Sequence, residues 1–415
     1  MGLCPIREEH EQNCLRAYAL GVWGYNPGQH GQASKRMKVQ VLQENLQRGL
    51  AIVGRAVAAR STLPITSNVL MATDGGRLRL SATDLDISIS TWIGAKIEEE
   101  GATTIPARLI TDFVGQLPPA TVSIEVPERT RQAKLECART ESTINTMDAE
   151  DFPRIAAIDE GPSIELDAAT LRRTIDRVEF AAATDDSRPV ITGVSIKGEE
   201  SKLTFAASDG FRLAVSDIEL GARQAFPVTD LNLIVPSRAL REVGRLIGDG
   251  AAPVELRVNE KQTQVQFSMT DVELVAQLIQ GTFPNYNQLI PGEFNTATVV
   301  DVDDFMRGAR IAAIFARDGS GIVRLQVQPS GEGGSGKLVI SARADEVGDN
   351  EGEIDVKVDG EPAKIAFNSR YLADVLGVLD GEVRLETTSP SSQGVFRPAE
   401  EDGYVHVVMP MFVQW

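Results

Sequence analysis

Few residues in this chain have the types and spacing that covalent or redox chemistry requires. Its three histidines are His10, His30 and His406, and the first two lie within residues 1–36. A Ser-His-Asp or Cys-His arrangement, or a zinc site built on histidine, therefore cannot be assembled from the rest of the chain. The sequence therefore offers no histidine-based catalytic site outside residues 1–36, and we expect no cofactor.

The residues near the N-terminus offer one candidate metal site. Cys4, His10, Cys14 and His30 are suitable ligand types, but their spacing matches no common zinc pattern, so we expect no metal there. The remaining cysteine, Cys137, stands alone. Three irregularly spaced cysteines do not suit a disulfide framework either, and we expect none.

A glycine-rich segment near residue 330 has a spacing close to that of a phosphate-binding loop. It reads Gly331-Glu-Gly-Gly-Ser-Gly336-Lys337. Leu338 follows, where Ser or Thr would hold Mg²⁺, and the next residues form a strand-like run rather than a helix. A hairpin turn is the preferred interpretation, and a nucleotide-using enzyme is the weakest of our hypotheses.

The stretch Ser208–Ala214 suits binding rather than catalysis. It ends a strand-like run with Asp-Gly, which is turn chemistry, and leaves the turn with Arg212 and Leu213. One interpretation is a surface turn with an arginine of no special role. The other is one wall of a binding site, and the organisation of the rest of the chain favours it.

Helix-like segments recur along the chain in two families. In the first, an arginine follows two positions after the first apolar residue of an amphipathic run. In the second, an arginine follows a small residue where such a run begins, at intervals of about 130 residues. The first family comprises residues 46–56, 171–181 and 305–315, and the second comprises residues 105–114, 235–244 and 367–376.

Strand-like segments repeat at matching places. Residues 80–84, 205–209 and 340–344 each follow the first helix of a repeat, and alternating runs separate the helices. The chain is therefore predicted to be α+β, with three tandem repeats of two helices plus antiparallel strands. We expect a flexible extension at residues 1–36 and domains at residues 37–160, 161–291 and 292–415.

The charge balance limits how this chain can meet nucleic acid. With 59 acidic and 41 basic residues its formal charge is −18, which excludes a protein that coats nucleic acid with its whole surface. Arginines nevertheless recur on the predicted helices. They predict a weakly basic face that touches phosphates without reading bases. No apolar run reaches the ~20 residues of a membrane span, so we expect a cytoplasmic protein.

From Met37 to the C-terminus the chain resembles the bacterial DNA polymerase III β sliding clamps. The resemblance rests on many short motifs that occur in order over all three repeats. They are Thr62-Leu-Pro-Ile65 with Asn68, Ala82-Thr-Asp-Leu85, Gly101–Arg108, Asp151-Phe-Pro153, Ser208–Ala214, Phe283-Pro-Asn-Tyr286 with Ile290-Pro291, and Val407–Met411.

The resemblance implies a DNA sliding clamp, a processivity factor without catalytic activity. It implies a head-to-tail homodimer that closes into a ring around duplex DNA, with helices lining the channel. It also implies a pocket for short peptides of the DNA polymerase III alpha subunit, the clamp loader, and other polymerases and repair proteins. A polymerase tethered in this way stays at high effective concentration on its template.

The pocket carries over onto three segments of this chain. Three of its positions differ from residues common in the family: Phe211 replaces a frequent His, Thr174 an apolar residue and Gln288 an Arg, so the peptide preference stays open. The chain also ends in Phe412-Val-Gln-Trp415. The implied pocket residues are Thr174, Ser208, Gly210, Phe211, Arg212, Leu213, Pro284, Gln288, Leu289, Val407, Val408, Met409, Pro410 and Met411.

The resemblance also assigns a DNA-facing set and a ring interface. Arg60 is the closest match to a family DNA contact, and the other arginines carry over only as a helix face. The interface is implied at Ile144, Ile314 and Phe315, with Glu141 and Ser142 where a basic and an aromatic residue are common. The other DNA-facing residues are Arg48, Arg55, Arg108, Arg173, Arg177, Arg238, Arg241, Arg245, Arg307, Arg310 and Arg370.

One alternative from another functional class remains open. A clamp-derived protein could bind peptides as a hub without encircling DNA. Glu141 and Ser142 at the implied interface, and acidic residues among the helix arginines, favour this alternative. Self-association and retention on circular DNA would distinguish the two functions.

Overall fold

The computed structural model describes residues 36–58, 63–127, 130–155, 157–199, 201–221, 231–316, 321–330, 335–344 and 348–415. The expected extension lies outside these residues except for Arg36, whose guanidinium pairs with Glu99 at 2.9 Å. The described residues up to Glu165 form a first compact unit together with Ala252–Gln277. Leu166–Ala251 and Leu278–Trp415 form a second unit. Among the described residues, no helix is long and apolar enough to cross a bilayer.

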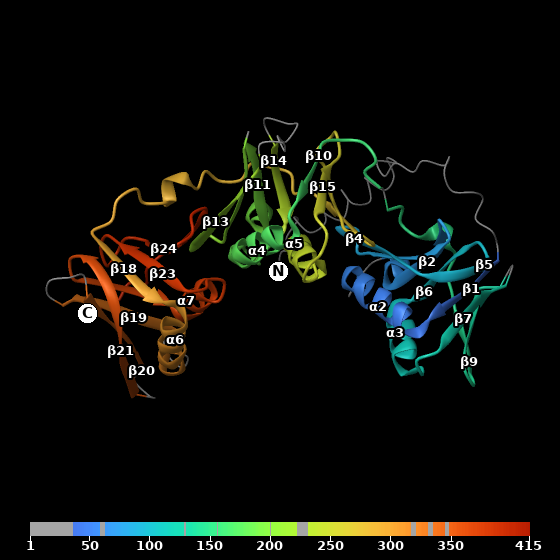
Figure 1. The fold of residues 1–415 in the computed structure, drawn as a ribbon, viewed down its shortest axis with the longest axis horizontal. Coiled ribbons are helices and arrows are strands. Elements are labelled where there is room, and N and C mark those ends of the chain that lie inside the picture. The colour runs from blue at the N-terminus through green and yellow to red at the C-terminus, as the bar shows by residue number, and fades with distance from the viewer. Residues whose placement is uncertain are drawn as a thin grey trace, which may run out of the picture. The chain divides into compact units, whose positions relative to one another are not determined.

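The α-helices of the described chain pack in pairs, one pair for each predicted repeat: α2 with α3, α4 with α5, and α6 with α7 (Figure 1). Apolar residues at helical spacing explain these contacts, as in α5, where Ala239, Leu240 and Val243 are buried. The helices span Gln43–Val53 (α2), Ala107–Gln116 (α3), Ala168–Val178 (α4), Ser237–Leu246 (α5), Val302–Ala316 (α6) and Ser369–Leu376 (α7).

Antiparallel sheets complete the first unit. One has the strand order β5-β1-β7-β8-β9 and the other β10-β15-β16-β17-β4-β3-β2-β6. The five-stranded sheet comprises β1 (Met37–Leu42), β5 (Ala95–Glu99), β7 (Thr121–Val126), β8 (Gln132–Cys137) and β9 (Thr140–Asn145). The eight-stranded sheet comprises β2 (Asn68–Asp74), β3 (Arg77–Thr83), β4 (Ile87–Ile93), β6 (Ala102–Pro106), β10 (Ser163–Leu166), β15 (Val254–Val258), β16 (Gln264–Ser268) and β17 (Val272–Gln277).

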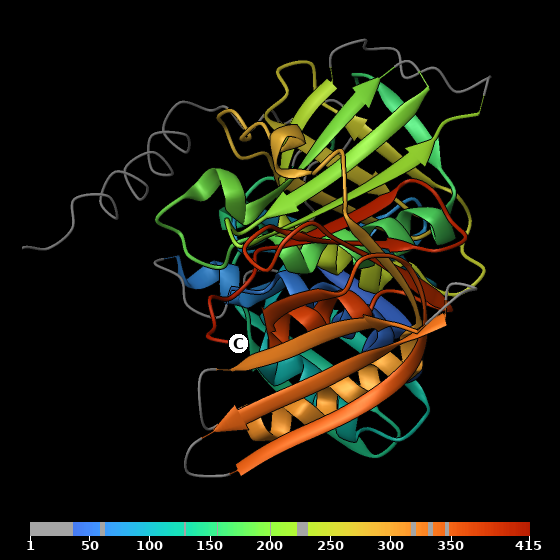
Figure 2. The same ribbon diagram turned by 90° about the vertical axis from the view of Figure 1, so that its left-hand side faces the viewer.

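A twelve-stranded sheet runs through the second unit in the order β14-β11-β12-β13-β25-β24-β23-β18-β21-β20-β19-β22. Helix α6 lies along one face of β19, β20 and β21 (Figure 2). The strands are β11 (Gly193–Glu199), β12 (Lys202–Ser208), β13 (Arg212–Glu219), β14 (Leu231–Pro236), β18 (Thr296–Asp301), β19 (Ile322–Pro329), β20 (Ser335–Ala344), β21 (Gly348–Gly360), β22 (Ala363–Asn368), β23 (Glu382–Thr387), β24 (Gly394–Pro398) and β25 (Tyr404–Val408).

Sheets continue from one repeat to the next through equivalent strands. Strand β4 of the first repeat pairs with β17 of the second, for example at Ile89 and Leu274. Strand β13 of the second repeat pairs with β25 of the third in the same way, with Leu213 opposite Val407. In each junction, one strand follows the β3–β4 turn of the first repeat or the equivalent β12–β13 turn of the second. This strand pairs with the last strand of the next repeat. The predicted α+β fold with three repeats is therefore confirmed.

Two strands that occupy these same positions keep an open edge. Strand β9 ends the first repeat and pairs only with β8 among the described strands. Strand β21 belongs to the third repeat. Its residues 348–356 pair with β20 alone among the described strands, whereas residues 357–360 pair with β18. Each of these edges presents the kind of backbone groups that another strand can bind.

The glycine-rich segment is not a phosphate-binding loop. Lys337 lies within strand β20, and its ammonium pairs with Glu353 of β21 at 2.6 Å. A phosphate-binding loop requires a helix N-terminus directly after the lysine, and a strand is found instead. Residues 331–334 lie outside the described residues. The hairpin interpretation agrees with the paired strands on either side of this segment.

Candidate functional site

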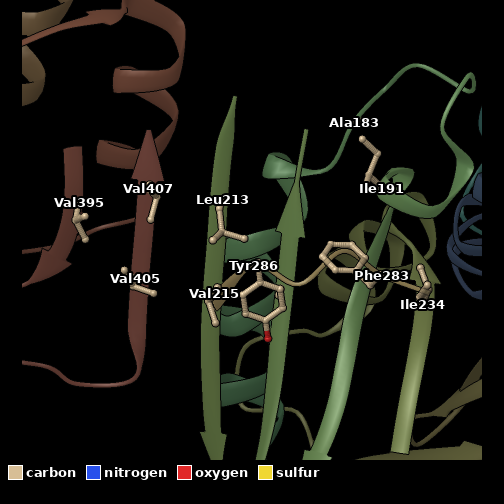
Figure 3. Packing of buried hydrophobic residues seen from close by; sticks show 11 residues of the cluster. Ala183, Ile191, Leu213, Val215, Ile234, Phe283, Tyr286, Val395, Val405 and Val407 are labelled. Atoms are coloured by element: carbon tan, nitrogen blue, oxygen red, sulfur yellow. The ribbon is translucent and has the colours of Figure 1, made fainter. Parts of the chain in front are cut away.

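An apolar cluster lies where β13 meets β25. Its residues come from β12, β13 and β14, from the neighbouring strands β24 and β25 of the third repeat and from loops of the second repeat (Figure 3). We call this set the β13–β25 cluster. It comprises Ala183, Ile191, Ala206, Leu213, Val215, Ile234, Phe283, Tyr286, Val395, Val405 and Val407, with Val190, Ile279 and Ile290 packed against it.

Strand geometry explains which residues enter this cluster. Successive side chains of a strand point to opposite faces, so Leu213 and Val215 share one face of β13, whereas Arg212 has the other. On β25, Val405 and Val407 have the same face as Leu213, since Leu213 is directly opposite Val407. Two apolar faces thus meet across a junction that backbone hydrogen bonds hold together.

The turn before β13 is shaped by short side chains. Gly210 has a φ of +93°, a conformation that favours glycine. Asp209 accepts hydrogen bonds on Oδ1 from the backbone N–H groups of Phe211 (2.8 Å) and Arg212 (3.0 Å). Ser208 donates its hydroxyl to the carbonyl of Arg212 at 2.7 Å. The turn therefore holds Phe211 outward, with 61% of the residue exposed.

The C-terminal segment lies against this turn. The backbone N–H of Met409 donates to the carbonyl of Phe211 at 2.9 Å, and that of Met411 donates to Ala366 at 2.8 Å. Met409 is 41% exposed, as is Leu289 of the short 3-10 helix Asn287–Leu289. Pro284 and Gln288 are exposed too, and Pro410 and Met411 are half-buried. Exposed apolar side chains thus come from the turn, the loop before the third repeat and the C-terminal segment.

Several sequence-predicted pocket residues are not on this surface. Thr174 is buried in helix α4 and is not part of the cluster. Val408 is buried opposite Arg212, on the other face of the sheet from Leu213. The guanidinium of Arg212 binds Asp374 on α7 at 2.6 Å. These three residues belong to the packing behind the surface.

Sequence reasoning missed Ile191 as a member of the cluster, and used Phe283 and Tyr286 only as family motifs. A signal for Ile191 was present, because it lies in a 3-10 helix, Pro189–Thr192, that repeats the one at Pro64–Ser67. By position, Ile65 corresponds to Val190, and Ile191 corresponds to Thr66, which is buried as well. Comparing these two Pro-containing segments would have drawn attention to Ile191.

Behind the junction lies a buried polar group. His406 of β25 is fully buried, stacks on Phe180 with ring centroids 5.5 Å apart, and has its Nδ1 3.4 Å from the hydroxyl of Tyr404. Burial lowers the pKa of His406 to about 3, and it raises the pKa of Tyr404. The imidazole is therefore neutral at physiological pH. Among the described residues, no group of His, Cys, Asp and Glu could hold a metal ion.

The helix arginines differ widely in exposure. Arg177 was expected to face DNA, but it is buried and its guanidinium binds the Glu401 carboxylate at 2.9 and 2.7 Å. Arg241 is half-buried and pairs with Glu179 at 2.7 Å. Arg60 lies outside the described residues. The exposed members of the set are Arg48, Arg55, Arg108, Arg173, Arg238, Arg245, Arg307, Arg310 and Arg370.

Carboxylates accompany several of the exposed arginines. Arg245 pairs with Glu242 at 2.9 Å, and Arg307 pairs with Asp304 at the same distance. Arg173 approaches Glu401 at 3.7 Å. A cavity of about 980 Å³ between α4 and α7 is lined by both arginines and carboxylates. Arginines and carboxylates are therefore mixed on these helices.

The residues implied for a ring interface also differ in how exposed they are. Ile314 on α6 is 60% exposed and Phe315 is partly exposed, whereas Ile144 on β9 is buried within the first unit. The burial of Ile144 follows from the alternation along β9, in which its neighbours face outward. Glu141 on β9 pairs with Lys134 at 3.0 Å, and Ser142 is partly exposed.

Family models match three consecutive parts of the chain. The N-terminal domain of the DNA polymerase III beta subunit matches residues 37–156, the central domain residues 165–285 and the C-terminal domain residues 287–412. The chain belongs to the DNA polymerase III beta subunit family. This family consists of DNA sliding clamps, which are processivity factors without catalytic activity, and the chain has the function of a sliding clamp.

Individual sliding clamps of this family resemble the chain over nearly their whole length. The beta sliding clamp of Synechococcus elongatus is 32% identical over 378 residues, which cover 90% of this chain and 99% of that protein. The Bacillus subtilis clamp structure covers 91% of this chain and 100% of its own, with 27% identity and a TM-score of 0.85. A Pseudomonas aeruginosa clamp bound to griselimycin gives 29% identity, the same coverage and a TM-score of 0.80.

Proposed function

We propose that two copies of this chain close head to tail into a ring around duplex DNA. The observation that carries this proposal is the pair of open edges at β9 and at residues 348–356 of β21. They occupy the positions that pair at the β4–β17 and β13–β25 junctions. A second copy that docks β9 against β21 repeats the same junction between chains, and such a heterologous contact closes a ring when the rotation allows it.

Apolar residues near the end of α6 support this interface. Ile311, Ile314 and Phe315 lie there, and the first two are among the exposed large apolar residues of the chain. Exposed apolar side chains on one helix are typical of an interaction site. The proposed domains, residues 37–160, 161–291 and 292–415, then supply three repeats from each copy.

Duplex DNA is the proposed occupant of the ring, held without sequence preference. Exposed arginines recur on helices of all three repeats, for example Arg48, Arg173 and Arg310. Arginine binds phosphates through electrostatic contacts that carry no base information. A ring is held on DNA by topology, so weak and mobile contacts suffice, and the charge of −18 disfavours DNA on the rest of the surface.

The β13–β25 cluster and the exposed residues around it are the proposed docking surface for peptides of partner proteins. Leu213 and Val407 form its buried part, and Phe211, Met409 and Leu289 are exposed. Methionine adapts its shape at low cost, which suits a surface with several partners. The proposed partners are the DNA polymerase III alpha subunit, the clamp loader, and other polymerases and repair proteins, in the cytoplasm. The relative that binds griselimycin supports a ligand site in this family.

Sedimentation and DNA retention test the ring together. We expect the full chain to sediment as a dimer at micromolar concentration and, once loaded, to stay on closed circular DNA but slide off after linearisation. The charge introduced by Ile314→Asp should shift the sedimentation profile to monomer, because Ile314 is proposed to be buried between copies. A chain that is monomeric without substitution and equally retained on circular and linear DNA would instead favour a peptide-binding hub.

A further inference from the structure

The Arg212 side chain lies on the face of the sheet opposite Leu213, where it packs between the second and third repeats. It is 9% exposed. Its Nε donates to Asp209 Oδ2 at 3.0 Å, one Nη donates to Asp374 at 2.6 Å and the other to the carbonyl of Phe180 at 2.6 Å. The guanidinium also lies over the rings of Tyr371 (4.6 Å) and Phe180 (5.2 Å).

These contacts use each nitrogen of the guanidinium and place the group beside two aromatic rings. A planar guanidinium with its donors bound to carboxylates and a carbonyl is held in one orientation. The ring contacts add cation–π attraction, which is strongest where water is excluded. Arg212 therefore has little capacity left to bind an external carboxylate.

The partners of Arg212 come from both repeats. Asp209 belongs to the turn that holds Phe211 outward, whereas Asp374 belongs to helix α7 of the third repeat. Met409 donates its backbone N–H to the carbonyl of Phe211 on the same turn. Arg212 thus connects Asp374 to the turn and, through Phe211, to the start of the C-terminal segment.

We propose that Arg212 is a positioning residue for the ligand surface, fixed by Asp374, and that it does not contact the ligand. The pair fixes the turn that carries Phe211, and helix α7 thereby sets how well peptides bind on the opposite face of the sheet. This inference rests on the proposed function of the β13–β25 cluster in peptide binding.

Asp374→Asn is the decisive variant, because Asp374 lines the cavity between α4 and α7 and is not part of the β13–β25 cluster. We expect the affinity for griselimycin, and for peptides tiled over the cell's own replicative polymerase, to fall about tenfold in the full-length variant, as measured by calorimetry. Arg212→Ala should lower it at least as much. Arg212→Lys should restore part of the loss, because it keeps the charge beside Asp374.

Amide exchange supplies a readout that a general loss of stability does not mimic. In Asp374→Asn the backbone amides of Phe211 and Arg212 should exchange faster. Both amides bind the carboxylate of Asp209, and the Arg212 side chain that holds this carboxylate would itself no longer be fixed by Asp374. The matched control is Arg384→Ala, which removes an arginine that pairs with Glu386 at 3.1 Å and lies over Phe294 at 4.9 Å. It should leave both the affinity and the exchange of the turn unchanged.

The outcomes separate this inference from the function on which it rests. Asp374→Asn that binds both probes as the unsubstituted chain does, while Arg212→Ala has lost affinity, would show direct contact and overturn the positioning role. If Met409→Ala weakens binding and Asp374→Asn does not, only the inference about Arg212 fails. If the unsubstituted chain binds neither probe, the proposed peptide surface fails, and the positioning role with it.

Discussion

Arg177 and Glu401 form a bidentate ion pair, with Nη1–Oε1 and Nη2–Oε2 distances of 2.9 and 2.7 Å. The pair joins helix α4 to the segment before β25. The hydroxyl of Tyr404 donates to the carbonyl of Arg177 at 3.1 Å, and the guanidinium lies 5.2 Å from the centre of its ring. One of the recurring helix arginines therefore links the second repeat to the third.

Glu401→Gln should lower the melting temperature at pH 7, because it removes the charge that binds the buried Arg177. The hydrogen bond from Arg177 lowers the pKa of Glu401. A carboxylate with a lowered pKa stabilises the fold above its unfolded pKa, and this contribution disappears as pH falls through the lowered value. Solvent screening at the half-exposed Glu401 limits the loss to about 1 kcal/mol.

Thermal denaturation at pH 7 and at pH 3 checks this prediction. The difference between the unsubstituted chain and Glu401→Gln should narrow in acid. The neighbouring exposed Glu400 provides the control substitution Glu400→Gln, which should change little. An equal melting temperature for all three chains at pH 7 would refute a stabilising role for the pair.

His406 should make the fold sensitive to mild acid. Its pKa is lowered to about 3 by burial, so it stays neutral in the folded chain while the unfolded chain takes up a proton below about pH 6.5. Stability attributable to His406 is therefore complete above pH 6.5. It decreases on acidification by up to ~1.4 kcal/mol per pH unit until the folded pKa is reached.

His406→Phe tests this dependence, because phenylalanine keeps the stack on Phe180 without a titrating group. Denaturant unfolding between pH 7.5 and pH 4.5 should show a shallower loss of stability for the variant. Parallel curves for the two chains would assign the acid sensitivity to other groups.

Met409→Ala should separate ligand binding from stability. Met409 is 41% exposed, so we expect its truncation to weaken peptide binding by about 1–3 kcal/mol while the melting temperature changes little. Leu213→Ala should weaken binding similarly, but Leu213 is buried and its loss should also destabilise the fold by about 2–5 kcal/mol. Calorimetry with griselimycin and tiled polymerase peptides measures the first effect and chemical denaturation the second.

The exposed Leu42 in the first unit supplies the matched control for these apolar truncations. Leu42→Ala should bind both probes normally. Unchanged affinity in both Met409→Ala and Leu213→Ala would remove these residues from the proposed peptide surface.

Charge reversal on the helices should change how binding to DNA depends on salt. Arg108 and Arg370 lie at equivalent helix starts and are exposed. The double variant Arg108→Glu, Arg370→Glu should bind linear duplex less well, with a salt slope smaller by about one for each of the two arginines that binds a phosphate. Titrations at several salt concentrations, on unrelated DNA sequences, measure this.

Lys337→Glu reverses a charge on strand β20 instead of on a helix and should leave the slope unchanged. A double variant with the slope of the unsubstituted chain would place the DNA-binding residues elsewhere.

Much of the fold was readable from local patterns. The six predicted helices match α2–α7 to within a few residues, because each has a regular apolar stripe that packs on its partner. The strand repeats at residues 80–84, 205–209 and 340–344 end β3, β12 and β20. The strand pairings between repeats were not predicted, because pairing depends on edges that meet only in the folded chain.

The candidate site was predicted less completely. Position-by-position resemblance found Leu213, Val407 and Met409, which lie on or beside the β13–β25 cluster. It also assigned Thr174 to the pocket, although that residue is buried in helix α4, and it omitted Ile191. Spacing along the chain does not state which of two faces a buried side chain enters.

By itself, the sequence determined the family, the three repeats and the absence of a histidine-based active site from most of the chain. These properties depend on residue types and on spacings within one repeat. Only the tertiary structure decided the roles of Arg212 and Arg177, each of which binds a carboxylate far away in the sequence, at separations of 162 and 224 residues. An arginine on a helix or strand can bind a ligand or an internal carboxylate with the same chemistry. Folding selects the partner, because it buries the guanidinium and brings a distant carboxylate within 3 Å of it.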